Sequence, residues 1–161
     1  MLELKYSGEL IIGEKEFIIP ELISMKDFEQ NNPYHPEGNL MNHTQQVLKL
    51  LGKDNRDLWL AGVFHDIGKQ TRWQISKKNK NYKTFYGHDR ESAKLFLKFN
   101  KEHNFNDLNF NVEKVHWIIY NHIKIMFYDK MREIKKITLN TSPWFEDLKK
   151  FRQCDEGGRH D

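Results

Sequence analysis

Five titratable side chains lie in phase with the apolar faces of the helices predicted around them. His43 lies four and seven positions before Val47 and Leu50, so it continues an apolar helical face. The others in such phase are His65, His88, His122 and Asp155. The remaining histidines lack it, and we expect surface positions for them: His35, His103, His116 and His160. Because a titratable group in a core is costly unless it is paired or metal-bound, the five in-phase groups should meet at one polar centre.

Such a centre has the composition of a metal site. Neutral imidazole nitrogens and carboxylates suit a borderline divalent transition metal and leave coordination positions open for water. Nickel, manganese, cobalt, iron, zinc and magnesium are all compatible with these ligand types. A bound ion lowers the pKa of water and polarises a phosphoryl oxygen, so the predicted chemistry is hydrolysis of a phosphate ester. Asp66, next to His65, could bind the ion and also orient that water.

Helices must position most of these groups. Apolar residues recur at i, i+3, i+4 and i+7 in five segments, so we predict helices at about 41–51, 55–67, 88–102, 111–128 and 143–155. Pro20 suits the first position of another helix, which should run through about Phe28. The predicted fold class is therefore mainly α, a helical bundle.

A small β extension should precede the bundle. Residues 2–19 hold short β-favouring runs separated at two glycines, which predicts a hairpin or meander. The length of 161 residues is typical of one domain, so we expect a single unit over 1–161. It would consist of the β extension at 1–19 and a helical core at 20–161.

A basic segment separates the second and third of the five helices. Between positions 69 and 83 there is no acid, and the basic residues are Lys69, Arg72, Lys77, Lys78, Lys80 and Lys83. Gly68 should end the preceding helix, and Lys69 could then reach a phosphate held at the metal. Arg72 and the lysines could attract the rest of an anionic substrate, with Trp73 and Tyr82 stacking on a nucleotide or RNA end. The alternative is a solvated, charged hairpin or loop.

Composition narrows the partners. Lys and Arg number 26 and Asp and Glu 23, which gives a net charge of +3. This mild charge fits a phosphorylated small molecule or an RNA terminus and gives no indication of sequence-specific DNA binding, while the oligomeric state stays open. There is one cysteine, no secretory signal pattern, and no apolar run near the roughly 20 residues of a membrane span. We expect a cytoplasmic protein with no membrane partner.

Five sequence runs occur in order along the chain, and they are PELISMKDFEQNNPYHPEGNLMNHT, FHDIGKQT, FYGHDRESAKL, IIYNHI and CDEGGR. In order and approximate spacing they resemble the HD domain appended to bacterial tRNA nucleotidyltransferases, the CCA-adding enzymes. The resemblance covers residues 20–159. It implies an HD helical bundle and a metal-dependent phosphohydrolase.

The resemblance also implies roles for single residues. The positions that match the family's metal ligands are His43, His65, Asp66 and Asp155. His88 and His122 match positions that bind substrate phosphate or a second metal in related HD enzymes, and both could take part in catalysis. Lys69, Thr71 and Arg159 match residues that contact phosphate in the family.

Several functions are consistent with this resemblance. HD domains of some CCA-adding enzymes have 2′,3′-cyclic phosphodiesterase, 2′-nucleotidase and phosphatase activity, so we first expect such chemistry on a nucleotide or RNA terminus. The alternatives are a nucleoside mono- or triphosphate hydrolase, a non-catalytic nucleotide- or RNA-binding module, and a metal-stabilised structural unit. No Gly-Gly motif followed by paired aspartates occurs, so we expect no addition of CCA.

Overall fold

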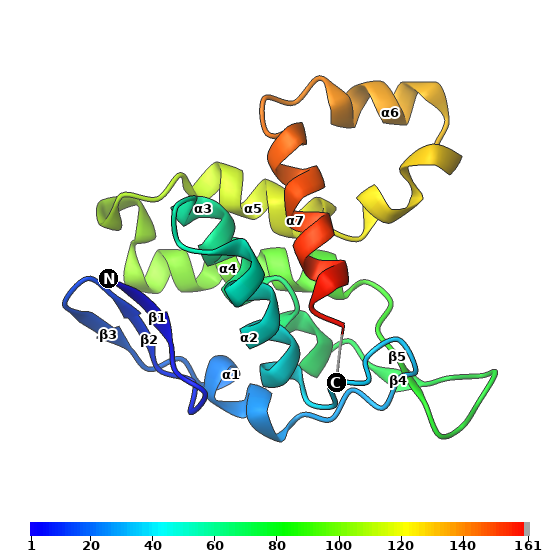
Figure 1. Cartoon of the computed structure of the whole chain (residues 1–161), viewed down its shortest axis with the longest axis horizontal. Coiled ribbons are helices and arrows are strands. Elements are labelled where there is room, and N and C mark those ends of the chain that lie inside the picture. Colours follow the sequence, from blue (N-terminus) through cyan, green and yellow to red (C-terminus); the bar gives the residue numbers. More distant parts are fainter. Residues whose placement is uncertain (160–161) are drawn as a thin grey trace.

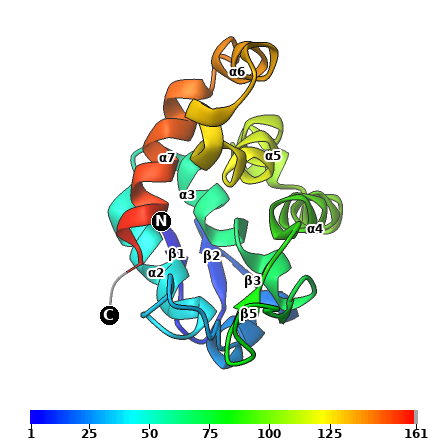
Figure 2. The same cartoon turned by 90° about the vertical axis from the view of Figure 1, so that its right-hand side faces the viewer.

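The computed structural model describes residues 1–159 and is mainly helical (Figures 1 and 2). Its α-helices are α1 (Pro20–Ile23), α2 (Leu40–Leu51), α3 (Arg56–Phe64), α4 (His88–His103), α5 (Val112–Asn121), α6 (Glu133–Asn140) and α7 (Phe145–Gly157). The 3-10 helices are η1 (Ser24–Asp27), η2 (Ile67–Gln70), η3 (Phe105–Leu108) and η4 (Lys124–Lys130). The predicted mainly α class is confirmed. Within residues 1–159, no helix has the length and apolar character needed to cross a membrane.

The predicted β extension is a three-stranded antiparallel meander. Its strands are β1 (Leu2–Leu4), β2 (Leu10–Ile12) and β3 (Lys15–Phe17), in the order β1-β2-β3. Leu2 pairs with Ile12 and Leu10 with Phe17, and all four side chains are buried in the common core. In Figure 1 the sheet lies at the lower left and α6 at the upper right, so the two lie at opposite ends of the molecule.

Helix α3 lies at the centre of the bundle. Every residue from Leu58 to Phe64 is buried, which is typical of a helix enclosed on all sides. It packs against α2, α4, α5 and α7. The side chain of Asn55 begins the helix by accepting a hydrogen bond from the N–H of Leu58 at 3.2 Å. Because α3 is enclosed, the residues that follow its last turn lie deep inside the protein.

The helix predicted from Pro20 to about Phe28 is α1 followed by η1. Two of the five periodic segments also form shorter helices than expected, and a histidine explains each end. The helices predicted at 55–67 and 111–128 end at Phe64 and Asn121, and His65 and His122 are the next residues. Each histidine donates from Nδ1 to the carbonyl three residues earlier, at 2.8 Å for His65 and 2.6 Å for His122. This side-chain bond competes with the regular backbone bonds of a continuing helix. The second segment continues instead as η4.

Helix α6 was not predicted. Its apolar residues Ile134 and Ile137 are exposed, and only Leu139 is buried. Figure 1 shows α6 standing apart from the layer formed by α4 and α5. The helix is only eight residues long, so it offers too few periodic positions for its sequence to indicate a helix.

The basic segment forms the predicted hairpin. Strands β4 (Gln74–Ile75) and β5 (Lys83–Thr84) pair antiparallel, with Gln74 opposite Thr84. The loop before α2 is tied to this hairpin, because the N–H of Lys83 donates to the carbonyl of Asn31 at 2.9 Å. The side chain of Asn32 in turn donates to the carbonyl of Lys83 at 2.9 Å. The loop and the hairpin therefore form one wall.

Gly68 allows η2 to lie against the start of α4. A Cβ atom on Gly68 would lie 2.6 Å from both the carbonyl oxygen of His88 and the backbone nitrogen of Ser92. The Gly68 N–H donates to Ser92 Oγ at 2.8 Å, which joins the two elements. This close approach places His88 beside the chain that carries His65 and Asp66.

We expect Gly68→Ala to lower the free energy of unfolding by about 1–3 kcal/mol, because its neighbours are backbone atoms that cannot move separately. Gly62→Ala is the matched control. The atoms nearest to its added methyl group would be side-chain carbons of Leu48 and Leu51, which can move without the backbone, and alanine favours the helix, so its effect should stay within about 1 kcal/mol. Urea denaturation of both variants measures the difference, and equal effects would contradict this account.

Candidate metal centre

A buried cluster of histidines and aspartates lies where α2, α3 and α7 meet. It consists of His43, His65, Asp66 and Asp155, with one side-chain nitrogen or oxygen of each within 4.8 Å of the others. All four side chains are buried. His43 projects from α2 and Asp155 from α7, while His65 and Asp66 directly follow α3. The four residues that the family resemblance singled out are thus brought together.

Imidazole nitrogens and carboxylate oxygens alternate within this cluster. His43 Nε2 lies 2.9 Å from Asp155 Oδ1 and 3.4 Å from Asp66 Oδ2. His65 Nε2 lies 3.2 Å from Asp66 Oδ2 and 3.3 Å from Asp155 Oδ1. Each Nε2 atom is therefore directed at the same two carboxylates.

The backbone sets the tautomers of three histidines. Each of them donates from Nδ1 to a carbonyl oxygen three residues earlier, and the pairs are His65 with Gly62 at 2.8 Å, His88 with Phe85 at 2.8 Å and His122 with Ile119 at 2.6 Å. A carbonyl can only accept, so Nδ1 must carry the proton. In the neutral ring Nε2 then presents its lone pair to the cluster, as a metal ligand requires.

His43 is oriented by two acceptors. Its Nδ1 lies 2.8 Å from Glu37 Oε1 and 3.1 Å from the carbonyl oxygen of Gly158. Burial favours the protonated acid, but hydrogen bonds from His35 and His43 hold the pKa of Glu37 at about 2. An ionised carboxylate therefore supports His43 from behind, an arrangement that is common around metal-binding histidines.

The surroundings of His65 indicate that the cluster can hold a divalent cation. Among residues 1–159 the Nε2 atom of His65 is buried without a hydrogen-bond partner, although two carboxylate oxygens lie within 3.3 Å. In the neutral tautomer a lone pair would face two anionic oxygens, so either a proton on Nε2 or a cation must lie between these atoms. Two imidazoles and two carboxylates are also a donor set that divalent transition metals accept. The cluster thus has the composition of a divalent metal site.

A second group of candidate ligands shares Asp66. Its other oxygen, Oδ1, lies 3.0 Å from His88 Nε2 and 3.3 Å from His122 Nε2. The two Nε2 atoms are 3.3 Å apart, and these three residues could also hold a cation. Burial lowers the pKa of His88, and although Asp66 opposes this shift, the net change favours the neutral ring. Asp66 thus faces one histidine pair with each oxygen.

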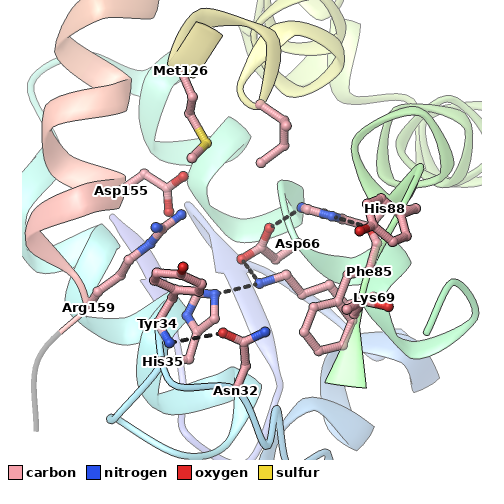
Figure 3. Close-up of a pocket in the computed structure, with 13 residues that line it drawn as sticks. Asn32, Tyr34, His35, Asp66, Lys69, Phe85, His88, Met126, Asp155 and Arg159 are labelled. Carbon is pink, nitrogen blue, oxygen red and sulfur yellow. Dashed lines mark hydrogen bonds and ion pairs between the residues drawn. The ribbon is translucent and has the colours of Figure 1, made fainter. Parts of the chain in front are cut away.

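A cavity of about 480 Å³ opens beside the cluster (Figure 3). Among its lining residues are Asn32, Tyr34, His35, Asp66, Lys69, Tyr86, His88, Asp155 and Arg159. Figure 3 shows Asp155 and Arg159 on one side, Asp66 in the middle and His88 on the opposite side. Thr71 and Arg72 do not line this cavity; both are exposed, and Arg72 pairs with Glu91 at 3.4 Å. Their contact with substrate stays a prediction.

Lys69 is more deeply buried than its predicted place in a basic loop implied. It is 3% exposed, and its Nζ lies 2.8 Å from Gln30 Oε1 and 3.2 Å from Asp66 Oδ2. Burial favours the protonated acid, but the charges of His65 and Lys69 hold the pKa of Asp66 well below its usual value. The ammonium group is therefore fixed beside the carboxylate that both candidate cation groups share.

Some residues around the centre were not identified from sequence. His35, for which we expected a surface position, is 9% exposed; its Nδ1 lies 2.9 Å from Glu37 Oε1 and its Nε2 lies 3.3 Å from Lys69 Nζ. Gln30 holds Lys69, and Glu37 supports His43. These residues lie in the irregular segment before α2, where no helical phase exists to show which side chains face inward. His160 lies outside the described residues.

Metal binding should release protons from this centre. Burial opposes protonation, but the charges of Asp66 and Asp155 raise the pKa of His65 to about 10, so the metal-free ring holds an extra proton at neutral pH. An entering ion must displace it, and affinity should fall about tenfold per proton for each pH unit from about 8 to about 6. Calorimetric titration with Mn²⁺ in two buffers of different ionisation enthalpy counts the protons. A pH-independent affinity would contradict the prediction.

Comparison with known proteins identifies the family. The model of the HD domain family matches residues 39–141, more than half of the chain. No curated protein and no solved structure matches the chain. The closer resemblance to CCA-adding enzymes therefore stays a prediction. The chain belongs to the HD domain family, and with its buried His/Asp cluster it is an HD-type metal-dependent phosphohydrolase.

Proposed function

We propose that this protein hydrolyses a phosphate ester or a 2′,3′-cyclic phosphate on a nucleotide or RNA terminus. Family membership supports phosphate chemistry, and the resemblance to the HD domain of CCA-adding enzymes favours the cyclic phosphate. The observation that carries the proposal is the cavity beside the cluster, because it brings an arginine and a buried lysine to the side of the candidate metal ligands. A purely structural metal site would have no need of an open cavity with such cations.

Arg159 is the residue best placed to bind a phosphate group. It lines the cavity, and its Nε atom is buried without a hydrogen-bond partner among residues 1–159. Guanidinium groups bind phosphate oxygens through paired, charge-assisted hydrogen bonds. An anionic ligand in the cavity would satisfy this donor, and Lys69 would neutralise charge from the other side of Asp66.

The other proposed roles follow from position. In this proposal His43, His65, Asp66 and Asp155 hold the ion, which when bound would polarise a phosphoryl oxygen and lower the pKa of water. Asp66, fixed by Lys69 at 3.2 Å, would orient the attacking water. Of the four proposed ligands, Asp66 and Asp155 line the cavity, and His43 and His65 contact these two carboxylates.

His88 and His122 have two compatible roles. Both Nε2 atoms face Asp66 Oδ1, so the pair could hold a second cation in the proposed centre. Alternatively, neutral His88 could bind the substrate phosphate or accept a proton from water, since it also lines the cavity. Counting metal ions per chain by elemental analysis separates the two roles.

The direct test is a hydrolysis panel. We expect Mn²⁺-loaded protein to hydrolyse members of a set of 2′,3′-cyclic nucleotides, nucleoside monophosphates and deoxynucleoside triphosphates. Asp66→Ala should lose turnover by a factor of about 10³ or more, because it removes the carboxylate that the four-residue cluster shares with His88 and His122. Asp54→Ala, an exposed loop substitution, is the matched control and should leave turnover unchanged.

The products distinguish the remaining functions. Ring opening of a cyclic nucleotide supports the proposal, whereas free phosphate or tripolyphosphate alone would indicate a nucleotidase or a triphosphate hydrolase. No turnover by metal-replete wild type, together with nucleotide affinity that survives Asp66→Ala, would indicate a binding module. Unfolding on metal removal, without turnover before it, would indicate a structural metal site.

Arg159→Ala should raise KM for the active substrate about tenfold or more, because a charge-assisted hydrogen bond to phosphate contributes about 1.5–3 kcal/mol. Metal content should not change, since Arg159 is not among the candidate ligands. Arg152→Ala is the control, because Arg152 pairs with Glu156 on α7 and lines no part of the cavity. Steady-state kinetics of both variants provide the measurement, and an equal KM in the two would contradict the role of Arg159.

A further inference from the structure

A second cavity adjoins the candidate metal centre. Its volume is about 560 Å³, and it lies between the β4–β5 hairpin and the loop before α2. The two cavities share the lining residues Asn32, Tyr34, Thr84 and Tyr86. A ligand whose phosphate lies beside Asp66 can therefore extend past these residues into the second cavity. In Figure 1 the turn of this hairpin projects away from the helices at the lower right.

The second cavity carries positive charge. Among residues 1–159 its lining includes Lys77, Lys78 and Lys83 and no acidic residue. Lys83 is used internally, since its Nζ donates to the carbonyl of Glu29 at 2.7 Å and lies 4.4 Å from the ring centre of Phe28. Within the described part of the chain, Lys77 and Lys78 form no ion pair and are exposed. These two ammonium groups are available to an anionic ligand.

Aromatic rings line the same path. Tyr34 and Tyr86 are 71% and 77% exposed and lie where the two cavities join, and Tyr82 is 37% exposed within the second cavity. None of the three rings stacks on another ring among residues 1–159. Exposed rings interleaved with unpaired lysines are the arrangement by which proteins bind single-stranded nucleic acid, with bases on the rings and phosphates at the cations.

This wall is held in place before any ligand binds. The N–H of Ser76 donates to the carbonyl of Tyr82 at 2.8 Å, which closes the hairpin above its turn. Asn32 donates to the carbonyl of Lys83 at 2.9 Å, which ties the hairpin to the loop that carries Tyr34. A preformed site loses less conformational entropy when a ligand binds. The spacing of lysines and tyrosines is therefore a property of the fold.

We propose that the substrate is the end of a single-stranded oligonucleotide, with its terminal phosphate beside Asp66 and the adjoining nucleotide in the second cavity. This inference rests on the proposed function, because it assigns the substrate class of the same site. A mononucleotide bound within the first cavity would leave Lys77, Lys78 and Tyr82 without a ligand. Chain length should therefore raise the rate beyond what a mononucleotide reaches.

The test compares 2′,3′-cyclic uridylate with oligouridylates of two and four residues that end in the same group. We expect kcat/KM to rise about tenfold or more from one residue to four, as one added stacking contact and two phosphate contacts would provide. Lys77→Ala/Lys78→Ala should bring the ratio of tetramer to monomer close to one. Lys94→Ala/Lys101→Ala, which removes the same charge from exposed positions of α4 outside both cavities, should retain it.

Stacking is tested at Tyr82. Tyr82→Phe keeps the ring and should preserve the length effect, whereas Tyr82→Ala should reduce it. A ratio near one in active wild type would overturn the inference and leave the proposed function standing. Equal ratios in both double-lysine variants would also overturn it.

A binding measurement covers the case in which no substrate is hydrolysed, which would contradict the proposed function. Fluorescence anisotropy then follows a labelled tetrauridylate with a free 3′ hydroxyl, and a matching tetrathymidylate distinguishes RNA from DNA. Affinity that decreases in Lys77→Ala/Lys78→Ala, with a salt slope smaller by about 0.7 per lysine, supports the oligonucleotide site. No binding of either strand overturns it.

Discussion

The structure is organised around the charge of one buried carboxylate. Asp66 is 3% exposed, and its two oxygens face the Nε2 atoms of four histidines and the ammonium group of Lys69. A carboxylate in such a place is tolerated only when positive or hydrogen-bonding groups surround it. Helices α2 and α4 therefore each contribute a histidine beside it, and α5 is followed by another. Helix α3 ends just before His65 and Asp66, which face these histidines. The need to stabilise the charge of Asp66 therefore determines both how these helices pack and where the centre lies.

Helix ends are used to aim the side chains. At His65 and His122 the imidazole Nδ1 donates to a carbonyl of the last helical turn, and the helix stops there. One local interaction therefore ends the helix, sets the tautomer and directs Nε2 at Asp66. His88 uses the same bond from the opposite end of a helix, at the first residue of α4. Gly68 lets η2 approach α4 closely enough for these bonds to converge.

The surroundings of the centre differ from those of a metal site that only stabilises a fold. On the inner side, Glu37 and the carbonyl of Gly158 hold His43, and Gln30 and His35 contact Lys69. On the outer side the centre faces a cavity with Arg159, whose buried Nε has no partner in the described chain. Tight support behind the candidate ligands, and an arginine donor without a partner in front of them, are what hydrolysis of an anionic substrate requires.

The sequence by itself determined the class of the fold and the inward-facing candidates. A buried helical face repeats with a regular period, so the phases of His43, His88 and Asp155 could be read without a structure. The match to the HD family covers residues 39–141, so Asp155 and Arg159 lie beyond it and join the centre only because α7 packs against α2. Only the tertiary structure decided where α3 and α5 end, since the side-chain bonds that end them depend on which carbonyl each histidine reaches. It alone placed Gln30, His35 and Glu37 around the centre, because an irregular loop has no period, and its inward side chains are set by contacts with residues distant in the chain.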